Sequence, residues 1–254
     1  MPTVVTNGFT HYPEKLKGFE FVHVLAPYFL ELAQEKGIDT RNCHFAPQPV
    51  DVEAFRPRNG QQMRSFLGIA EDDFVVLAVG AINRYKRMNY AIREVGMLRT
   101  KHPNVKLLIA GEPESGTPVV VNLGRKVLGN DVIFRTAVHD MMPAVYAAAD
   151  VFVLPTRREI TGNVFTEAMA SGVPAIGDDY PVTRWIIGDG GDVTDMTRPG
   201  DLANLVEVYM TDGSYRSRKS KQARERAVDT FSMDSVSPQY LRMFNAVRED
   251  SRSA

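Results

Sequence analysis

Two glutamates, Glu159 and Glu167, stand eight positions apart in the segment that says most about the chemistry of this chain. An ionised carboxylate accepts strong hydrogen bonds through both oxygens, which suits the hydroxyl groups of a sugar or a ribose. The apolar run Val151–Leu154 precedes the pair, and the apolar run 173–176 follows it. We therefore expect a strand, a loop with Glu159, a helix over 165–170 with Glu167, and a second strand.

Both carboxylates are expected at the carboxyl edge of a parallel sheet, where open α/β folds bind their ligands. The amino end of the helix adds backbone N–H groups without intrahelical partners and a positive dipole, which suit a phosphate. By themselves, two glutamates at this spacing are more often a solvated loop and helix. The sequences Leu-Pro-Thr before the pair and Ala-Met-Ala-Ser-Gly-Val-Pro after it favour a binding site.

This segment resembles the donor-site signature of the retaining glycosyltransferases of group 1 (family 4), which have the GT-B fold. That signature is a glutamate, seven residues, a second glutamate, and a small-residue helix ending Ala-x-Gly-x-Pro. Here it reads Glu159, Glu167 and Ala170–Pro174. The resemblance implies that Glu159 contacts the donor sugar and that Glu167 contacts the ribose of the nucleotide.

The same resemblance implies that backbone amides between the glutamates approach the diphosphate, near Gly162, Asn163 and Val164. The family usually has Gly or Ser and then Phe-Gly after the first glutamate, whereas this chain has Ile160-Thr161-Gly162. Gly162 keeps the position that needs a close approach of the backbone.

A basic turn, 80–87, follows an apolar run of strand length and would reach the same edge of the sheet. Cations there could neutralise a diphosphate, whose charge grows as it leaves during glycosyl transfer. Alone, such a turn is more often a solvated surface loop. The family has Gly-Arg and then a lysine some five residues later, which Gly80 and Lys86 match. Ala81 stands at the arginine position, and Arg84 is the candidate to replace it.

The segment 134–138 lies where the family packs the nucleotide base, largely through backbone contacts. Val138 is the candidate contact, and recognition by the backbone leaves the identity of the base open. His139 follows in the same loop, where an isolated histidine is more often a surface or capping residue than a catalyst.

The composition is that of a globular chain of 254 residues, 44% of them hydrophobic, with a formal net charge of −1. This balance gives no indication of a nucleic-acid partner.

Cys43 is the only cysteine, which excludes a disulfide framework and favours a reducing cytosol. No transmembrane-length run or signal peptide is visible, so we expect a cytoplasmic protein. The basic run 216–221 favours a solvated helix face, with peripheral membrane contact as the minority interpretation.

No metal and no cofactor are expected beside the donor substrate. The histidines have no spacing that would build a metal site with acids. An Asp-x-Asp pair could hold a metal for a nucleotide sugar, but Asp178-Asp179 and the run 189–192 lack that spacing and indicate turns.

Apolar runs alternating with helical stretches predict an α/β fold, a Rossmann-like parallel sheet with helices on both faces, beside a partial second α/β domain. The expected strands are 19–25, 42–46, 74–79, 105–110, 132–134, 151–154 and 173–176, and the expected helices are 28–36, 89–100, 119–128, 141–149, 165–170, 201–211, 215–231 and 234–247.

Three segments are predicted from this pattern and the resemblance. Residues 1–56 would be a remnant of the amino-terminal acceptor domain with the connector, 57–232 the nucleotide-sugar-binding domain, and 233–254 a closing helix. The glycine-rich loop and acceptor-binding residues of the family's amino-terminal domain have no counterpart here. The chain is therefore expected to be truncated relative to a two-domain enzyme, with the missing half supplied by another chain.

The resemblance implies transfer of a hexose from a nucleotide diphosphate sugar to a hydroxyl acceptor on a sugar, a lipid-linked sugar or a protein, with retention and without metal. The candidate catalytic residues are Glu159, Lys86 and Arg84, and the candidate donor-binding residues are Glu167, Gly162, Asn163, Val164, Gly80 and Val138. One alternative is a non-catalytic nucleotide-sugar-binding module or a subunit of a split transferase. Another is an unrelated Rossmann-like protein such as a nucleotide-sugar epimerase relative, which the glutamate pair beside Lys86 disfavours.

Overall fold

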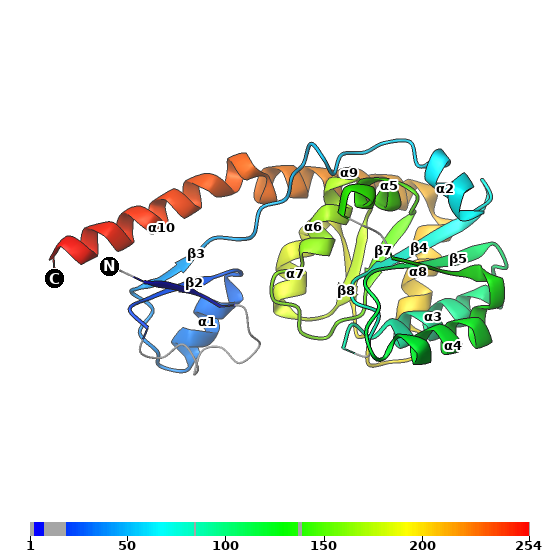
Figure 1. Cartoon of the computed structure of the whole chain (residues 1–254), viewed down its shortest axis with the longest axis horizontal. Coiled ribbons are helices and arrows are strands. Elements are labelled where there is room, and N and C mark those ends of the chain that lie inside the picture. The colour runs from blue at the N-terminus through cyan, green and yellow to red at the C-terminus, as the bar shows by residue number, and fades with distance from the viewer. Residues whose placement is uncertain (1–2, 8–18, 84, 137–138, 254) are drawn as a thin grey trace.

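The computed structural model describes residues 3–7, 19–83, 85–136 and 139–253. These residues form two parallel sheets, one of three strands and one of six (Figure 1). The strands of the larger sheet are β4 Phe74–Val79, β5 Val105–Ala110, β6 Val132–Arg135, β7 Val151–Leu154, β8 Ala175–Asp178 and β9 Gly191–Thr194.

The larger sheet has the order β6-β5-β4-β7-β8-β9, with every neighbouring pair parallel. The chain builds outward from β4 through β5 to β6, then returns to β7 and builds outward in the other direction. The order reverses between β4 and β7, and such a switch point opens a crevice at the carboxyl ends of the two strands.

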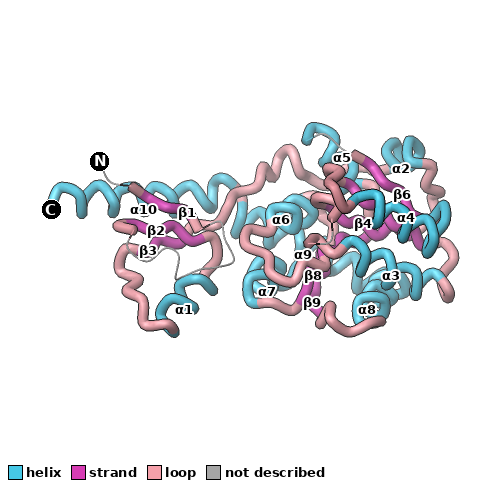
Figure 2. Tube along the Cα trace, turned by 60° about the horizontal axis from the view of Figure 1, so that its bottom comes forward, coloured by secondary structure: helices cyan, strands magenta, loops and turns pink. Residues whose placement is uncertain are grey.

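Helices cover both faces of this sheet (Figures 1 and 2). They are α2 Gln61–Leu67, α3 Met88–Arg99, α4 Thr117–Leu128, α5 Met142–Ala147, α6 Asn163–Ala170, α7 Pro181–Ile187, α8 Asp201–Thr211 and α9 Gly213–Phe231, with short 3-10 turns η2 Gly129–Asp131, η3 His139–Met141 and η4 Gly188–Gly190.

The buried strand β4 shows how the sheet packs on two sides. Its side chains alternate between faces, as a pleated strand requires. Val75, Leu77 and Val79 join a core with α5, α6, α7 and α9, while Val76 and Ala78 join a second core with α3, α4 and α8. The predicted Rossmann-like sheet with helices on both faces is therefore confirmed.

The small sheet contains β1 Val4–Thr6, β2 Phe21–Val24 and β3 Cys43–Phe45, which pair in parallel in that order. Helix α1, Tyr28–Glu35, packs on it, and α10, Met233–Ser253, extends from the larger sheet past the small one (Figure 1). The ring of Tyr240 on α10 lies 5.2 Å from the ring of His23 on β2.

Aromatic pairs join the two sheets. The ring of Tyr28 on α1 lies 5.5 Å from that of Tyr180, before α7, and the ring of Phe45 on β3 lies 5.5 Å from Trp185. Trp185 in turn lies 5.3 Å from Phe231. Trp185 is half-buried and lies between the ring of Phe45 on β3 and that of Phe231 on α9.

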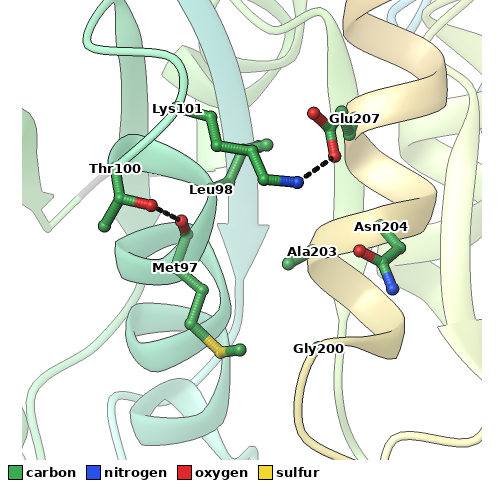
Figure 3. A pocket seen from close by; sticks show the side chains of 8 residues that line it. All are labelled: Met97, Leu98, Thr100, Lys101, Gly200, Ala203, Asn204 and Glu207. Atoms are coloured by element: carbon green, nitrogen blue, oxygen red, sulfur yellow. Dashed lines mark hydrogen bonds and ion pairs between the residues drawn. The ribbon is translucent and has the colours of Figure 1, made fainter.

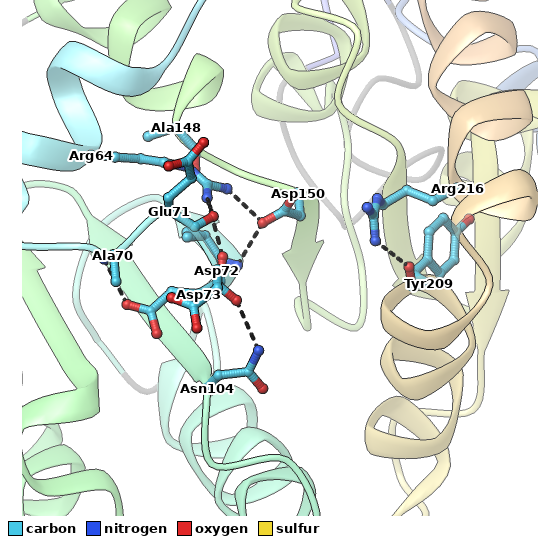
Figure 4. Close-up of polar contacts among 11 residues, drawn as sticks. Arg64, Ala70, Glu71, Asp72, Asp73, Asn104, Ala148, Asp150, Tyr209 and Arg216 are labelled. Carbon is cyan, nitrogen blue, oxygen red and sulfur yellow. Dashed lines mark hydrogen bonds and ion pairs between the residues drawn. The ribbon is translucent and has the colours of Figure 1, made fainter.

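One interpretation of charged residues is wrong, and a second holds only in part, since Arg218 and Lys221 are exposed on α9 but two of their neighbours are not. Asp192, expected in a turn, lies in the edge strand β9 and accepts hydrogen bonds from the hydroxyls of Tyr209 (2.5 Å) and Tyr215 (2.7 Å). The run 216–221 is not uniformly solvated, since Lys219 donates to the carbonyl of Gly191 at 2.7 Å. Arg216 donates to the Tyr209 carbonyl at 2.8 Å (Figure 4).

Candidate functional site

The loops after β4 and β7 meet beside the switch point and carry the central ion pair. Lys86 Nζ donates to Glu159 Oε2 at 3.1 Å, and the two side chains are 22% and 11% exposed. The other carboxylate oxygen, Oε1, accepts from the backbone N–H of Ile160 at 3.3 Å. The Lys86 amide is held by the side-chain oxygen of Asn83 at 2.8 Å, which fixes the turn.

Gly80 lies against the side chain of Lys86. It ends β4 with φ of 143°, in the region that favours glycine. A Cβ atom at Gly80 would stand 3.6–3.7 Å from the methylene carbons of Lys86, and one at Gly111 would stand only 1.9 Å from the Gly80 carbonyl oxygen. Two adjacent strand ends therefore approach closely, and the lysine stem runs over them.

Gly162 turns the chain into α6. Its φ is 61°, and a Cβ atom would lie 2.5 Å from Ile186 Cδ1, so both the conformation and the space demand glycine. The helix begins at Asn163. The N–H groups of Phe165 and Thr166 donate to the carbonyl of Gly162 at 2.8 and 3.3 Å, and those of Asn163 and Val164 precede these first helical hydrogen bonds. Glu159 lies beside this helix start, since its Cγ is 3.5 Å from that same Cβ position.

Glu167 lies on α6, four residues after the helix begins, and has a different environment from Glu159 in the loop before it. Its Oε2 accepts a hydrogen bond of 2.8 Å from the hydroxyl of Tyr146 on α5. Burial raises the pKa of Glu167, while the Tyr146 hydrogen bond and the nearby charge of His139 act to lower it. A half-buried carboxylate with one oxygen held is suited to accept hydrogen bonds from a ligand.

The structure thus gathers Gly80, Lys86, Glu159 and the start of α6 around one end of the switch point. Glu167 lies on the same helix. Arg84 and Val138 lie outside the described residues, and their assigned roles stay predictions.

Sequence reasoning missed two residues at this edge. Arg87, part of the basic turn, has φ of 52° and donates to the carbonyls of Pro155 (3.2 Å) and Met196 (2.7 Å). It therefore ties the ends of β7 and β9 together rather than facing solvent. Tyr146 has no motif around it, and only its packing against α6 reveals its contact with Glu167.

The acids after β8 are already bonded within the fold. Asp178 Oδ1 accepts from the backbone N–H of Met196 at 3.0 Å, and burial raises the pKa of Asp178. Asp179 pairs with Arg184.

In the described part of the chain, no group of three or more His, Cys, Asp or Glu residues could hold a metal ion. None of the described helices combines the length and the apolar character needed to cross a bilayer.

A hollow lies between α3 and α8, and its lining residues are distinct from those at the switch point (Figure 3). Glu207 on its wall accepts from Lys101 Nζ at 3.2 Å and from His102 Nε2 at 2.8 Å. The lining residues are Met97, Leu98, Thr100, Lys101, Gly200, Ala203, Asn204 and Glu207, none of which is a predicted site residue.

Known proteins of similar sequence match most of this chain. Residues 60–226 match the family model described as glycosyl transferases group 1. The chain is 28% identical over 204 residues to the D-inositol 3-phosphate glycosyltransferase of Paenarthrobacter aurescens (strain TC1), covering 78% of this chain and 50% of that protein. It spans about half the length of the first curated relatives that it matches.

Two solved structures share the fold. Sucrose-phosphate synthase (tll1590) from Thermosynechococcus elongatus has a TM-score of 0.80 at 23% identity, covering 94% of this chain and 60% of that one. Anabaena Alr3699/HepE in complex with UDP and glucose has a TM-score of 0.83 at 19% identity, covering 96% of this chain and 71% of that one.

Proposed function

Because this chain belongs to the group 1 glycosyltransferases, we propose that it forms the donor-binding half of a retaining, metal-independent hexosyltransferase. The donor would be a nucleoside diphosphate hexose and the acceptor a hydroxyl group. The observation that carries this proposal is the 3.1 Å pair of Lys86 and Glu159, on the two loops that flank the switch point, beside the start of α6.

Each group at this edge has a place in the proposed reaction. Lys86 and the first amides of α6 would bind the diphosphate and stabilise the negative charge that it gains when the bond to the sugar breaks. Glu159 would orient the hexose hydroxyls, and Glu167 would accept hydrogen bonds from the ribose. Stabilisation of the leaving group would supply much of the catalysis.

Several parts of this proposal concern the rest of the enzyme. We propose that residues outside this chain complete the acceptor side of the cleft, since the relatives are about twice as long. A cytoplasmic location is proposed as well, because the single cysteine, Cys43, is typical of a reducing compartment.

Calorimetry tests the proposal first. UDP, GDP, ADP and their hexose derivatives are titrated into the protein in EDTA, and UDP-glucose leads because a protein of similar fold holds UDP and glucose. Binding of one nucleotide sugar in EDTA supports a metal-independent donor site. Binding of none of them contradicts the proposal.

A turnover assay then separates the transferase from the binding module. The ligand found by calorimetry is incubated with the protein, and the anomeric configuration of released or transferred hexose is followed by proton NMR. First release of the anomer present in the donor supports retention, whereas first release of the opposite anomer contradicts it. Binding without any turnover favours the non-catalytic module or a split transferase.

A further inference from the structure

Tyr146 on α5 is fully buried and is held on two sides by other rings. Its ring centroid lies 5.8 Å from that of Phe55 in the connector and 6.1 Å from that of Phe152 on β7, both in edge-to-face geometry. These contacts leave the ring little freedom, because buried aromatic side chains in close-packed cores are confined to one orientation. The Tyr146 hydroxyl is therefore held at a fixed position.

At this position the hydroxyl contacts the carboxylate of Glu167. The Tyr146 hydroxyl lies 2.8 Å from Glu167 Oε2 and 3.4 Å from the carbonyl oxygen of Val164 in the first turn of α6. Among the described residues, Glu167 Oε1 accepts no hydrogen bond. The carboxylate is thus held by one oxygen and keeps its other oxygen for a ligand.

We propose that Tyr146 is the positioning residue of the nucleotide site, which fixes Oε2 of Glu167 so that Oε1 is presented to the ribose hydroxyls. The inference rests on the proposed function, because it takes the ribose of a nucleotide as the ligand. Tyr146 itself does not touch the ligand in this arrangement and acts through Glu167.

The phenol also favours the ionised form that such a ligand requires. Burial raises the pKa of Glu167, and the Tyr146 hydrogen bond opposes this because it stabilises the carboxylate. His139 faces Glu167 from η3 and lowers the same pKa when charged. Arg224 on α9 lies at the other end of α6, where it donates to the carbonyl of Ala170 at 2.8 Å. Removal of the phenol alone should therefore raise the pKa of Glu167.

The chain contains a matched control for this contact. Tyr209 is also fully buried and donates to a carboxylate, that of Asp192, at 2.5 Å. Asp192 also accepts from Tyr215 and pairs with Lys219 at 3.2 Å, so it lies in a structural cluster on β9. Tyr209→Phe thus removes a comparable hydroxyl and leaves Glu167 untouched.

The experiment compares Tyr146→Phe, Tyr209→Phe and the wild-type protein. The Glu167 carboxyl is titrated by carbon-13 NMR in ligand-free protein, with the signal assigned by its loss in Glu167→Gln. We expect its midpoint to move to higher pH in Tyr146→Phe only. UDP affinity, measured by calorimetry as a function of pH, should fall about tenfold in Tyr146→Phe near neutral pH, and the loss of binding on acidification should begin at higher pH.

An unchanged Glu167 midpoint in Tyr146→Phe would overturn the proposal, whatever its UDP affinity. A shifted midpoint with unchanged UDP affinity would also overturn it, because the Tyr146 hydroxyl would then affect the charge of Glu167 without affecting nucleotide binding. Binding of no nucleotide by the wild-type protein would contradict the proposed function, and the ligand-free titration would still decide whether Tyr146 controls Glu167.

Discussion

The amino ends and the carboxyl ends of the strands in the six-stranded sheet, here called its amino edge and its carboxyl edge, use charged side chains in different ways. At the amino edge, Arg64 donates to Asp150 at 2.7 Å, to the Ala148 carbonyl at 3.0 Å and to the Asp73 carbonyl at 3.1 Å (Figure 4). At the carboxyl edge, Lys86 forms an ion pair with Glu159 alone among the described acids. Charges with many partners stabilise the fold, whereas charges with remaining hydrogen-bonding capacity can serve a ligand.

A second cluster strengthens this contrast. Lys106, at the start of β5, lies 2.6 Å from Asp131 and 3.6 Å from Asp73, and Arg99 lies 2.5 Å from Asp131. The amino edge is thus a network of ion pairs between the ends of strands and helices. If the contrast holds, substitutions at the amino edge should lower stability, and those at the carboxyl edge should lower ligand affinity.

The largest expected effect is on stability, in Arg64→Met. The side chain is only 14% exposed, and its loss leaves the Asp150 carboxylate without its ion-pair partner. The free energy of unfolding should fall by about 3 kcal/mol, as when one partner of a buried pair is removed. Urea denaturation gives this value, and calorimetry should show unchanged UDP affinity. Arg93→Met, at an exposed position of α3, is the control and should change neither quantity.

Lys86→Met should show the opposite pattern. Loss of a cation that contacts a diphosphate should weaken UDP binding by about 2 kcal/mol, the range of a hydrogen bond to a charged group. The free energy of unfolding should fall less than in Arg64→Met, because Arg64 also donates to the carbonyls of Ala148 and Asp73, whereas Lys86 has Glu159 as its only ion-pair partner among the described acids. Calorimetry and urea denaturation measure the two quantities. Equal UDP affinity in this variant and in the wild type would remove the phosphate role from Lys86.

Glu159→Gln should distinguish the sugar from the nucleotide. The change removes the charge that orients the hexose hydroxyls, while Lys86 stays available for the diphosphate. The affinity for the UDP-hexose should fall by about 1 kcal/mol, typical of one hydrogen bond, and that for UDP should stay the same or rise. Parallel titrations with both ligands give the ratio, and an equal loss for both would argue against a sugar contact.

The smallest effect is expected in the pH dependence of stability around Glu167. Its pKa in the folded protein is raised by burial, so protonation of this carboxyl favours folding. That contribution is present below the pKa of the unfolded chain and is lost as the pH rises through the folded value. Glu167→Gln should therefore be more stable than the wild type at neutral pH, with a difference that shrinks on acidification. A difference that grows on acidification would contradict the assigned environment of Glu167.

The parts of the fold that could be predicted from the sequence are those with a strong local signal. The continuous apolar run of β4 specifies a strand buried on both faces, and the segment from Glu159 to Glu167 carries its motif in consecutive residues. Strand β9 was missed because Gly191-Asp-Val-Thr has little apolar character and lies at the sheet edge. Helix α2 is short and mostly polar, so its sequence gave no clear period.

The contacts that complete the site could not be predicted because they depend on packing between separate elements. Tyr146 reaches Glu167 across 21 positions of sequence, and this requires α5 and α6 to pack side by side. Arg87 reaches the carbonyl of Met196 across 109 positions, from a left-handed backbone conformation that a basic turn does not reveal. Neither contact can be inferred from the composition or from the spacing of residues along the chain.

The most direct test of the central claim is to map where UDP binds, by nitrogen-15 NMR chemical shifts of the wild-type protein in EDTA. We expect the largest shifts at Gly80, Lys86, the first turn of α6 and Glu167, while the amides around Arg64 and Asp150 stay unchanged. Shifts concentrated in the hollow between α3 and α8, or at the amino edge, would contradict the assignment of the carboxyl edge as the nucleotide-sugar site.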